Sequence, residues 1–373
     1  MSAGSRYAVH LFRDFAPVAP LMAALAGRGG SGIPFQDTRW LSLWYKHFAA
    51  VGIEPLIAVV TEGEGAPAPD NVAMALPLVR RRKYLLPLVE FADRGITDYN
   101  LPFEGPRCPR SAADMRALVA SLQKAVRPFA LLRLSKMPRE VGGRLNPFAL
   151  LDETQAAALE AHNMVLPRQT DELLAGLSKK KRTEIGRIGR ILDTLGEHRF
   201  AVTDAAADRA PVFDLIRRAQ RVRVPGKNER YFLEDEGYRQ FYDALVLGEA
   251  AAGFSVVSAI WLDGRPVAGL LGVRSDDRYV GLRIGVSDEP EIARLGLGKI
   301  LLFRTAEWAI GRGIRVFDFS LGGTALKAWF HPEPFALVEY GSILNGIRMP
   351  QWLRPSPRPA TQEQGEESPS IPG

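Results

Sequence analysis

The residues best suited to chemistry are two glycines one residue apart, Gly296 and Gly298, which directly precede an apolar run that ends near Gly311. Glycine lets the backbone approach a ligand closely, and the first turn of a helix offers unpaired N–H groups and the positive end of a dipole. The junction therefore suits a phosphate or a pyrophosphate. An ordinary tight turn, whose glycines only supply positive φ angles, is the alternative interpretation.

Two familiar phosphate motifs are missing from this part of the sequence. No third glycine completes GxGxxG, and no GKS or GKT triplet follows to hold a triphosphate and magnesium. The five histidines are scattered, and the single cysteine, Cys108, lies among prolines and arginines, so no metal-ligand spacing is present. The sequence therefore favours neither a nucleotide-binding fold nor a metal site.

Helical and strand patterns surround the glycine pair. Apolar residues at helical spacing, often behind a capping residue such as Asp37, Ser111 or Ser178, predict helices. These cover residues 38–51, 112–127, 179–195, 213–220, 238–247 and 299–311. Apolar runs predict strands over residues 55–60, 72–79, 84–91, 129–134, 254–262, 265–273, 278–286 and 316–319. The Asp263-Gly264 pair is the strongest hairpin signal.

The order of these segments predicts two similar domains. In the second half, helices precede an antiparallel meander, the glycine turn, a helix and a further strand, and the first half follows a worn version of this plan. We therefore expect an α/β (α+β) fold of two tandem domains, each with a mixed, largely antiparallel sheet flanked by helices. The predicted domains are residues 1–150 and 151–349; residues 350–373, rich in Pro, Ser, Gln and Glu, are predicted to be disordered.

The charge of the chain favours an anionic partner without identifying one. The formal net charge is +6, and basic residues dominate one face of the helix predicted over residues 179–195, although such faces are often simply solvated. No apolar run approaches the roughly 20 residues of a membrane helix, and Arg6, His10 and Arg13 disfavour a cleaved signal. The sequence thus predicts a cytoplasmic protein without a membrane span.

Several segments, taken in order, carry a family resemblance. From "WLDGRPVAGLLGV" through "GLGKILLFRTAEWAIGRGIRVFDFSLGGTALKAWF", the chain resembles the GNAT superfamily of acyl-CoA-dependent N-acyltransferases. With "FQDTRWLSLWYKHF", "DYNLPF" and "LSKKKRTEIGRIGRILDTLG", it resembles more narrowly the CelD-like tandem subgroup linked with cellulose and exopolysaccharide biosynthesis. Ala293 stands where the superfamily often has Gln or Arg, with Arg294 beside it, so main-chain contacts to a pyrophosphate are the ones expected here.

The resemblance implies acetyl-CoA or another acyl-CoA as co-substrate, and no metal. The pantetheine amides would pair with one strand, the pyrophosphate would lie on the glycine turn, and N–H groups near Gly285 would stabilise an oxyanion as an amine attacks the thioester. The implied cofactor-binding residues are Ile284, Gly285, Val286, Gly296, Leu297, Gly298 and Lys299.

Four further residues are candidates for the reaction. Asp318, at the end of a strand predicted to be buried, is either the general base or a cap for the next loop. Lys327 either pairs with a CoA phosphate or the acceptor, or is simply solvated. Asp98 and Tyr99 match the subgroup's "DY" and would contact a small-molecule or glycan amine acceptor between the domains. Their alternative roles are a turn cap and a core residue.

Two other functions remain open. The tandem arrangement is also similar to the Fem-type aminoacyl transferases, which implies an aminoacyl-tRNA donor and salt-dependent RNA binding through the basic helix. No aromatic residues interleave with the charges of that helix, which weakens a site based on base stacking. In the third interpretation, the first domain is a degenerate partner-binding module and the chain is a non-catalytic scaffold.

Overall fold

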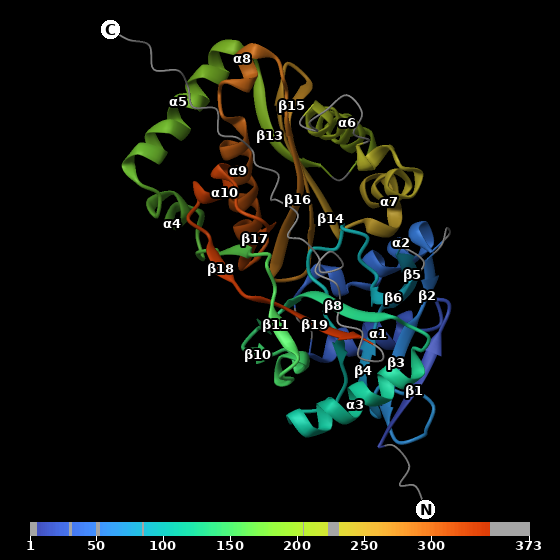
Figure 1. The fold of residues 1–373 in the computed structure, drawn as a ribbon. Helices are drawn as coiled ribbons and strands as arrows, with labels where there is room; N and C mark the ends of the chain where they lie inside the picture. The colour runs from blue at the N-terminus through green and yellow to red at the C-terminus, as the bar shows by residue number, and fades with distance from the viewer. Residues whose placement is uncertain are drawn as a thin grey trace, which may run out of the picture.

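The chain forms two halves, each built on β-sheet with helices packed against it (Figure 1). The structure, a computed structural model, describes residues 6–29, 32–49, 53–83, 86–203, 205–222 and 231–343. The tail predicted to be disordered, residues 350–373, lies outside the described residues.

A seven-stranded sheet organises the second half. Its strands lie in the order β13-β14-β15-β16-β17-β12-β18. Their bounds are β13 (His198–Thr203), β14 (Ser255–Leu262), β15 (Arg265–Arg274), β16 (Arg278–Val286), β17 (Val316–Leu321), β12 (Ala161–Val165) and β18 (Glu333–Phe335). Neighbouring strands are antiparallel except for β16 and β17, which are parallel. At Asp263 and Gly264, φ angles of 49° and 76° form the predicted tight turn between β14 and β15.

Helices cover both faces of this sheet. The helices α6 (Ala206–Val222) and α7 (Glu236–Leu247) pack on one face, and α5 (Lys179–Leu195) and α9 (Leu297–Gly311) pack on the other. Three short helices complete this half: α4 (Thr170–Ala175), α8 (Pro290–Ala293) and α10 (Ala325–Ala328). The predicted starts hold where a cap is present, because the Ser178 hydroxyl accepts from the N–H of Lys181.

The first half contains two smaller sheets that are joined at Pro77. Their strand orders are β1-β3-β4-β7 and β11-β19-β8-β6-β5-β2. The bounds are β1 (Tyr7–Phe12), β2 (Ile53–Pro55), β3 (Ile57–Glu62), β4 (Val72–Leu76), β5 (Leu78–Lys83), β6 (Leu86–Phe91), β7 (Phe103–Glu104), β8 (Leu131–Pro138), β11 (Thr154–Ala156) and β19 (Leu337–Ile343). Proline lacks the N–H that a continuous ladder needs, which explains the break between β4 and β5.

Three helices and a small hairpin complete the first half. The helices are α1 (Ala19–Gly29), α2 (Thr38–Phe48) and α3 (Ala112–Ala125), and the hairpin pairs β9 (Glu140–Val141) with β10 (Arg144–Leu145). Asp37 caps α2, and the Ser111 hydroxyl accepts from the N–H of Asp114 at 3.1 Å at the start of α3. Both caps are those that the sequence predicts.

The chain crosses between the two halves at β11–β12 and again at β18–β19. Along the chain, β11 lies at the edge of the first half's sheet, and the next strand, β12, enters the second half's sheet between β17 and β18. At the second crossing, β18 lies at the edge of the second half's sheet, and β19 enters the first half's sheet between β8 and β11. Val338 and Tyr340 of β19 are therefore buried in the core of the first half. Because the first half's sheet contains β11 and β19, which precede and follow the strands of the second half's sheet along the chain, we expect the halves to fold together.

Aromatic side chains also join the halves through α2 and α7. The rings of Trp40 and Phe241 lie with their centroids 5.0 Å apart, and those of Phe48 and Tyr238 lie 4.9 Å apart. One continuous cluster of buried apolar residues runs from the first half into the second. The interface between the halves is therefore part of the core.

The predicted fold class is confirmed, since both halves are mixed α/β with largely antiparallel sheets and flanking helices. The sequence does not predict β12, β18 and β19, because their pairing partners are remote in the chain and β18 is short and exposed. The domain boundaries stay a prediction; β19, within the predicted second domain, pairs with β8 in the first.

Candidate active site

The parallel strands β16 and β17 separate shortly after they pair. Their register covers only Arg278–Val280 against Val316–Asp318. Beyond Val280, no strand among the described residues pairs with β16 on the β17 side, although β16 continues to Val286 beside β15. The main chain of β16 therefore has an open edge here, and such an edge can bind an extended ligand by main-chain hydrogen bonds.

The predicted glycine turn lies where α9 begins. Gly296 has φ 73° and ψ 34°, a left-handed conformation that glycine adopts without strain, and no side chain of the described residues caps the helix. A Cβ added at Gly296 would meet nothing within 4 Å, whereas one at Gly298 would lie 3.3 Å from Leu326 Cδ2 and 3.7 Å from Ile284 Cδ1. The first turn of α9 thus has no side-chain cap and is open at Gly296, where anions bind well, while Gly298 lies beneath Leu326 and Ile284.

The side chain of Lys299 is held by the basic helix α5. Its Nζ lies 2.7 Å from a carboxylate oxygen of Glu184, and Trp329 Nε1 donates to the other oxygen at 3.2 Å. Burial acts to raise the pKa of Glu184, but hydrogen bonds from Lys299 and Trp329 lower it overall. The Lys181 ammonium lies over the Trp329 ring at 5.1 Å. The basic helix therefore packs beside the glycine turn and already uses the charge of Lys299.

The three predicted residues of β16 face different neighbours. Ile284 points toward α9, since its Cδ1 approaches Gly298, and Val286 packs on the same side of the sheet. Gly285 instead lies against α6, where an added Cβ would be 2.6 Å from Ile216 Cα and 3.1 Å from Ala219 Cβ. Glycine is thus required at position 285 because α6 packs directly against the strand there. The main-chain groups of Gly285 remain part of β16.

Asp318 is fully enclosed and has three donors. Its Oδ1 accepts from the Tyr99 hydroxyl and from the N–H of Ser320, both at 2.7 Å, and its Oδ2 accepts from Arg278 Nη1 at 2.7 Å. The side chain has 0% exposure. Burial raises the pKa of Asp318, while Arg278 and the other donors oppose the rise. The structure thus joins Asp318 and Tyr99, two predicted site residues remote in sequence.

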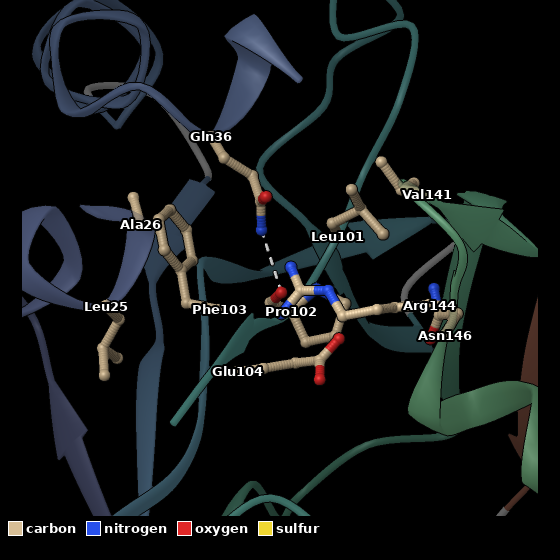
Figure 2. A pocket seen from close by; sticks show the side chains of 10 residues that line it. All are labelled: Leu25, Ala26, Gln36, Leu101, Pro102, Phe103, Glu104, Val141, Arg144 and Asn146. Carbon is tan, nitrogen blue, oxygen red and sulfur yellow. Dashed lines mark hydrogen bonds between the residues drawn. The ribbon is translucent and has the colours of Figure 1, made fainter. Parts of the chain in front are cut away.

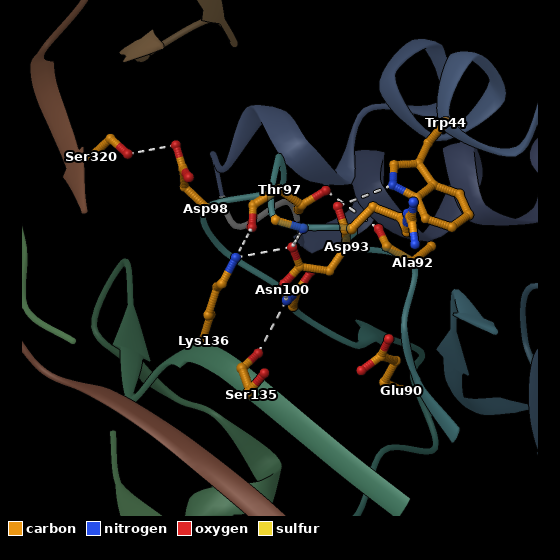
Figure 3. A network of polar contacts seen from close by, with 12 residues as sticks. Trp44, Glu90, Ala92, Asp93, Thr97, Asp98, Asn100, Ser135, Lys136 and Ser320 are labelled. Atoms are coloured by element: carbon orange, nitrogen blue, oxygen red, sulfur yellow. Dashed lines mark hydrogen bonds and ion pairs between the residues drawn. The ribbon is translucent and has the colours of Figure 1, made fainter. Parts of the chain in front are cut away.

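Asp98 lies next to this group but is half exposed. Its Oδ2 accepts from the Ser320 hydroxyl at 2.5 Å (Figure 3). Ser320 has a positive φ of 64°, a conformation that is rare for serine and that often marks functional sites. Lys327 Nζ donates to the carbonyls of Leu321 at 2.6 Å and Gly322 at 3.0 Å, so it holds the loop that follows β17.

The loop 92–102, between β6 and β7, carries Asp98 and Tyr99 to this place. Figure 3 shows how it is fixed to the first half: Lys136 Nζ contacts Asp93 Oδ1 and donates to the carbonyl of Thr97, both at 2.9 Å. The Asn100 side chain donates to Ser135 O at 3.1 Å. These hydrogen bonds fix the loop to β8 and so hold Asp98 and Tyr99 in place.

A separate pocket lies wholly within the first half (Figure 2). It is lined by Leu25, Ala26, Gln36, Leu101, Pro102, Phe103, Glu104, Val141, Arg144 and Asn146. The Gln36 amide donates to the carbonyl of Pro102 at 2.8 Å in this pocket. The predicted site residues do not line it.

Three residues of the site are missing from the sequence predictions: Arg278, Arg283 and Ser320. Arg278 and Arg283 are charged residues inside a strand whose other side chains are mostly apolar, and that contrast is the signal that could have found them. Ser320 gave no signal, because its positive φ arises from a bulge opposite β12. Within the described residues, no group of three or more His, Cys, Asp or Glu could hold a metal ion. No helix of that part is long and apolar enough to cross a bilayer.

Comparisons with known proteins agree with this geometry. Residues 179–328 match the family model of the acetyltransferase (GNAT) domain, and this segment contains β16, β17, the glycine turn, Asp318 and Lys327. No curated protein gives a significant match to the chain.

Several solved structures have a similar fold. A conserved protein of unknown function from Bacteroides thetaiotaomicron VPI-5482 has a TM-score of 0.55 at 12% identity over 90% of this chain and 99% of that one. FemX has a TM-score of 0.55 at 13% identity over 87% and 96% of the two chains. A tandem GNAT protein from the clavulanic acid biosynthesis pathway has a TM-score of 0.48 at 13% identity over 90% and 98%. At these identities the likeness concerns the fold alone.

Proposed function

We propose that this chain is an N-acyltransferase that transfers an acyl group from acyl-CoA to an amine. The observation that carries the proposal is the open edge of β16, which leads along the chain to the bare first turn of α9. An extended amide-bearing arm suits the strand edge, and a diphosphate suits the helix start. The family match over residues 179–328 supports the same activity.

In this proposal the main chain binds the donor. Ile284, Gly285 and Val286 pair with the pantetheine amides, and the turn from Gly296 to Lys299 contacts the diphosphate through N–H groups. The acceptor nitrogen attacks the thioester carbonyl carbon, so that a C–N bond forms, the C–S bond breaks and CoA leaves as the thiolate. The proton released by the amine passes to a base at the acceptor site and finally to the thiolate or to solvent.

Of the two carboxylates near the open edge, Asp98 is the one that an acceptor can reach. It is half exposed, and its second oxygen has no hydrogen-bond partner among the described residues. Asp318 and Tyr99 instead hold the frame around Ser320, and Lys327 holds the loop after it. A direct proton-accepting role for Asp318 stays a prediction, since it requires one of its three donors to give way to the acceptor.

The proposal is tested by calorimetry of the full chain with acetyl-CoA and with longer acyl-CoAs. We expect saturable binding at one site, which free CoA displaces because the diphosphate supplies much of the contact. If none of these thioesters binds, the proposed function is wrong. The cytoplasmic location of the protein and its link to polysaccharide or cell-envelope biosynthesis stay predictions.

A second candidate, transfer from an aminoacyl-tRNA, is favoured by the place of the basic helix. Lys179, Lys180, Arg187 and Arg190 of α5 are exposed, and α5 contacts both Lys299 and Trp329 beside the glycine turn. The fold likeness to FemX is compatible with this alternative. It predicts tRNA binding that weakens steeply with salt and is lost when these four residues are replaced by Gln, with acetyl-CoA binding absent.

A further inference from the structure

The guanidinium of Arg283 lies over two aromatic rings beside the proposed acceptor site. Arg283 CZ lies 5.2 Å from the ring centroid of Phe232 and 5.4 Å from that of Tyr242. Contacts of this kind fix the plane of a guanidinium but leave its edge, where the N–H donors lie, available to an acceptor. Arginine presented in this way suits bidentate binding of a carboxylate or phosphate.

A β-bulge puts Arg283 on this side of the sheet. In the register with β15, Leu271 lies opposite Arg283 and Gly272 lies opposite Gly281, so Leu282 is the extra residue. Arg283 consequently faces α7, while its neighbour Ile284 points toward α9 and the glycine turn. The main chain of β16 is thus available to the donor at the edge of the strand. The Arg283 side chain lies on the face of the sheet that α7 covers.

Two buried polar atoms of this cluster have no hydrogen-bond partner among the described residues. Arg283 Nη1 donates to the carbonyl of its neighbour Leu282 at 2.8 Å, but the buried Nε has no hydrogen-bond partner among the described residues. The buried hydroxyl of Tyr242 also makes no hydrogen bond of normal geometry to the described residues, although it interacts with the Arg283 side chain beside it. Buried polar groups in native proteins are usually satisfied, so two unsatisfied groups side by side indicate a place that a ligand completes.

Asp98 supplies an opposite charge near this cluster. It interacts electrostatically with both Arg283 and Tyr242, and together with Tyr242 it raises the pKa of Arg283 against the lowering effect of burial. No ion pair joins the Asp98 and Arg283 side chains, both of which are described and half exposed. The two charges are therefore near enough to attract each other and are still available to a third group.

We propose that the acceptor is an amine that also carries an anionic group, a carboxylate or a phosphate. Arg283, with the Tyr242 hydroxyl, binds the anionic group, and Asp98 binds the amine and orients it toward the open edge of β16. This inference rests on the proposed function and adds the chemical class of the acceptor to it. Arg283 acts as a specificity-determining residue, because a neutral amine leaves its buried donors unpaired.

Matched acceptors test the inference. Release of CoA thiol from acetyl-CoA is measured with each common amino acid and its C-terminal amide, and with glucosamine 6-phosphate and glucosamine. We expect kcat/KM to be at least about tenfold higher for the anionic member of the pair that is used, and the pair identifies carboxylate or phosphate. Equal rates within pairs, or acetyl-CoA binding without transfer to any anionic amine, would overturn the inference and leave the proposed function standing. Absence of acetyl-CoA binding would instead overturn the function.

Two variants separate recognition from folding. Arg283→Gln is expected to raise the acceptor KM at least about tenfold and to remove the preference for the anionic acceptor, with the acetyl-CoA dissociation constant unchanged. Arg274→Gln, in the neighbouring strand β15, is the matched control and keeps both values. Should Arg283→Gln not fold, Arg283→Lys retains the charge without the planar fork and is expected to give an intermediate KM. An unaltered preference in a folded Arg283 variant would contradict the inference.

Discussion

Each half of the molecule contains a parallel strand pair in which one strand, β8 or β17, also has a β-bulge. The space next to the point where the pairing ends is used differently in the two halves. β6 and β8 pair over Leu88–Glu90 and Leu131–Arg133, as β16 and β17 do over three residues each. The strand β8 has a bulge opposite β19, and β17 has a bulge opposite β12. Each bulge contains a residue with positive φ, Lys136 at 57° and Ser320 at 64°. The two halves therefore share one frame.

In the first half, the chain itself occupies the space beyond the pair. The N–H of Asn100 donates to the carbonyl of Lys136 at 3.0 Å, and loop 92–102 is bonded along the bulged part of β8. The helix that follows, α3, starts with a side-chain cap from Ser111, whereas α9 starts at the bare Gly296. One half thus fills its own site and carries Asp98 to the open site of the other. Four predictions test this comparison.

The largest effect is expected from a substitution in β19, the strand that returns to the first half's sheet. Tyr340 is 4% exposed and lies in the core of the first half, so Tyr340→Ala should lower the free energy of unfolding by about 3 kcal/mol. Both halves should still unfold in one denaturant transition, because β19 enters the first half's sheet directly after β18 at the edge of the second half's sheet. Tyr340→Phe, which keeps the ring and loses the hydrogen bond from Gln123, should cost about 1 kcal/mol. Two separate transitions, with the second half unaffected, would contradict the coupling of the halves.

The next effect concerns donor binding at equivalent positions of the two helix starts. Gly298→Val should weaken acyl-CoA binding about 100-fold, or about 2.7 kcal/mol, because the branched side chain occupies the space between α9 and Leu326. Ala113, at the second residue of α3, is exposed, and Ala113→Val serves as the control with unchanged affinity. Calorimetry measures both, with circular dichroism to check folding. Equal affinities would remove the glycine turn from the donor site.

A smaller effect on stability tests how closely α6 packs against β16. Gly285→Ala should destabilise the fold by about 2 kcal/mol, because the new Cβ would lie 2.6 Å from the backbone of α6 at Ile216. Gly281→Ala on the same strand meets nothing closer than 3.8 Å and should leave the melting temperature nearly unchanged. The comparison fails if the two variants melt alike.

The smallest effect is a pH dependence at the α2–α7 interface. Burial lowers the pKa of His47, a hydrogen bond with Gln240 opposes this, and Lys46 adds to it. The unfolded chain then binds the proton more tightly, so stability is complete above a pH of about 6.5 and falls as the pH drops below it. Between about pH 7.5 and about pH 5.5, the wild type should lose up to about 1 kcal/mol more than His47→Gln in urea titrations, since the ring is half exposed. Parallel pH curves would show that His47 makes no contribution.

Much of the second half follows from local sequence. The limits of β16, the end of α9, the turn at Asp263 and the start of α5 agree with their predictions, because apolar period, caps and glycine conformation act over a few residues. The helix α9 itself begins two residues before its predicted start, at Leu297. The entry of β11 and β19 into the first half's sheet and the role of Arg283 do not follow from local sequence. Pairing of β8 with β19 joins distant segments, and the place of Arg283 depends on a bulge that the sequence does not reveal.

By itself, the sequence determined the fold class, the glycine turn and the residue types of the site, since each depends on signals between near neighbours. Only the tertiary structure decided how the two carboxylates differ. Asp318 is enclosed and Asp98 is half exposed because β17, loop 92–102 and Arg278 meet from distant parts of the chain. Burial and hydrogen-bond partners are properties of that meeting, and they determine which group an acceptor can reach.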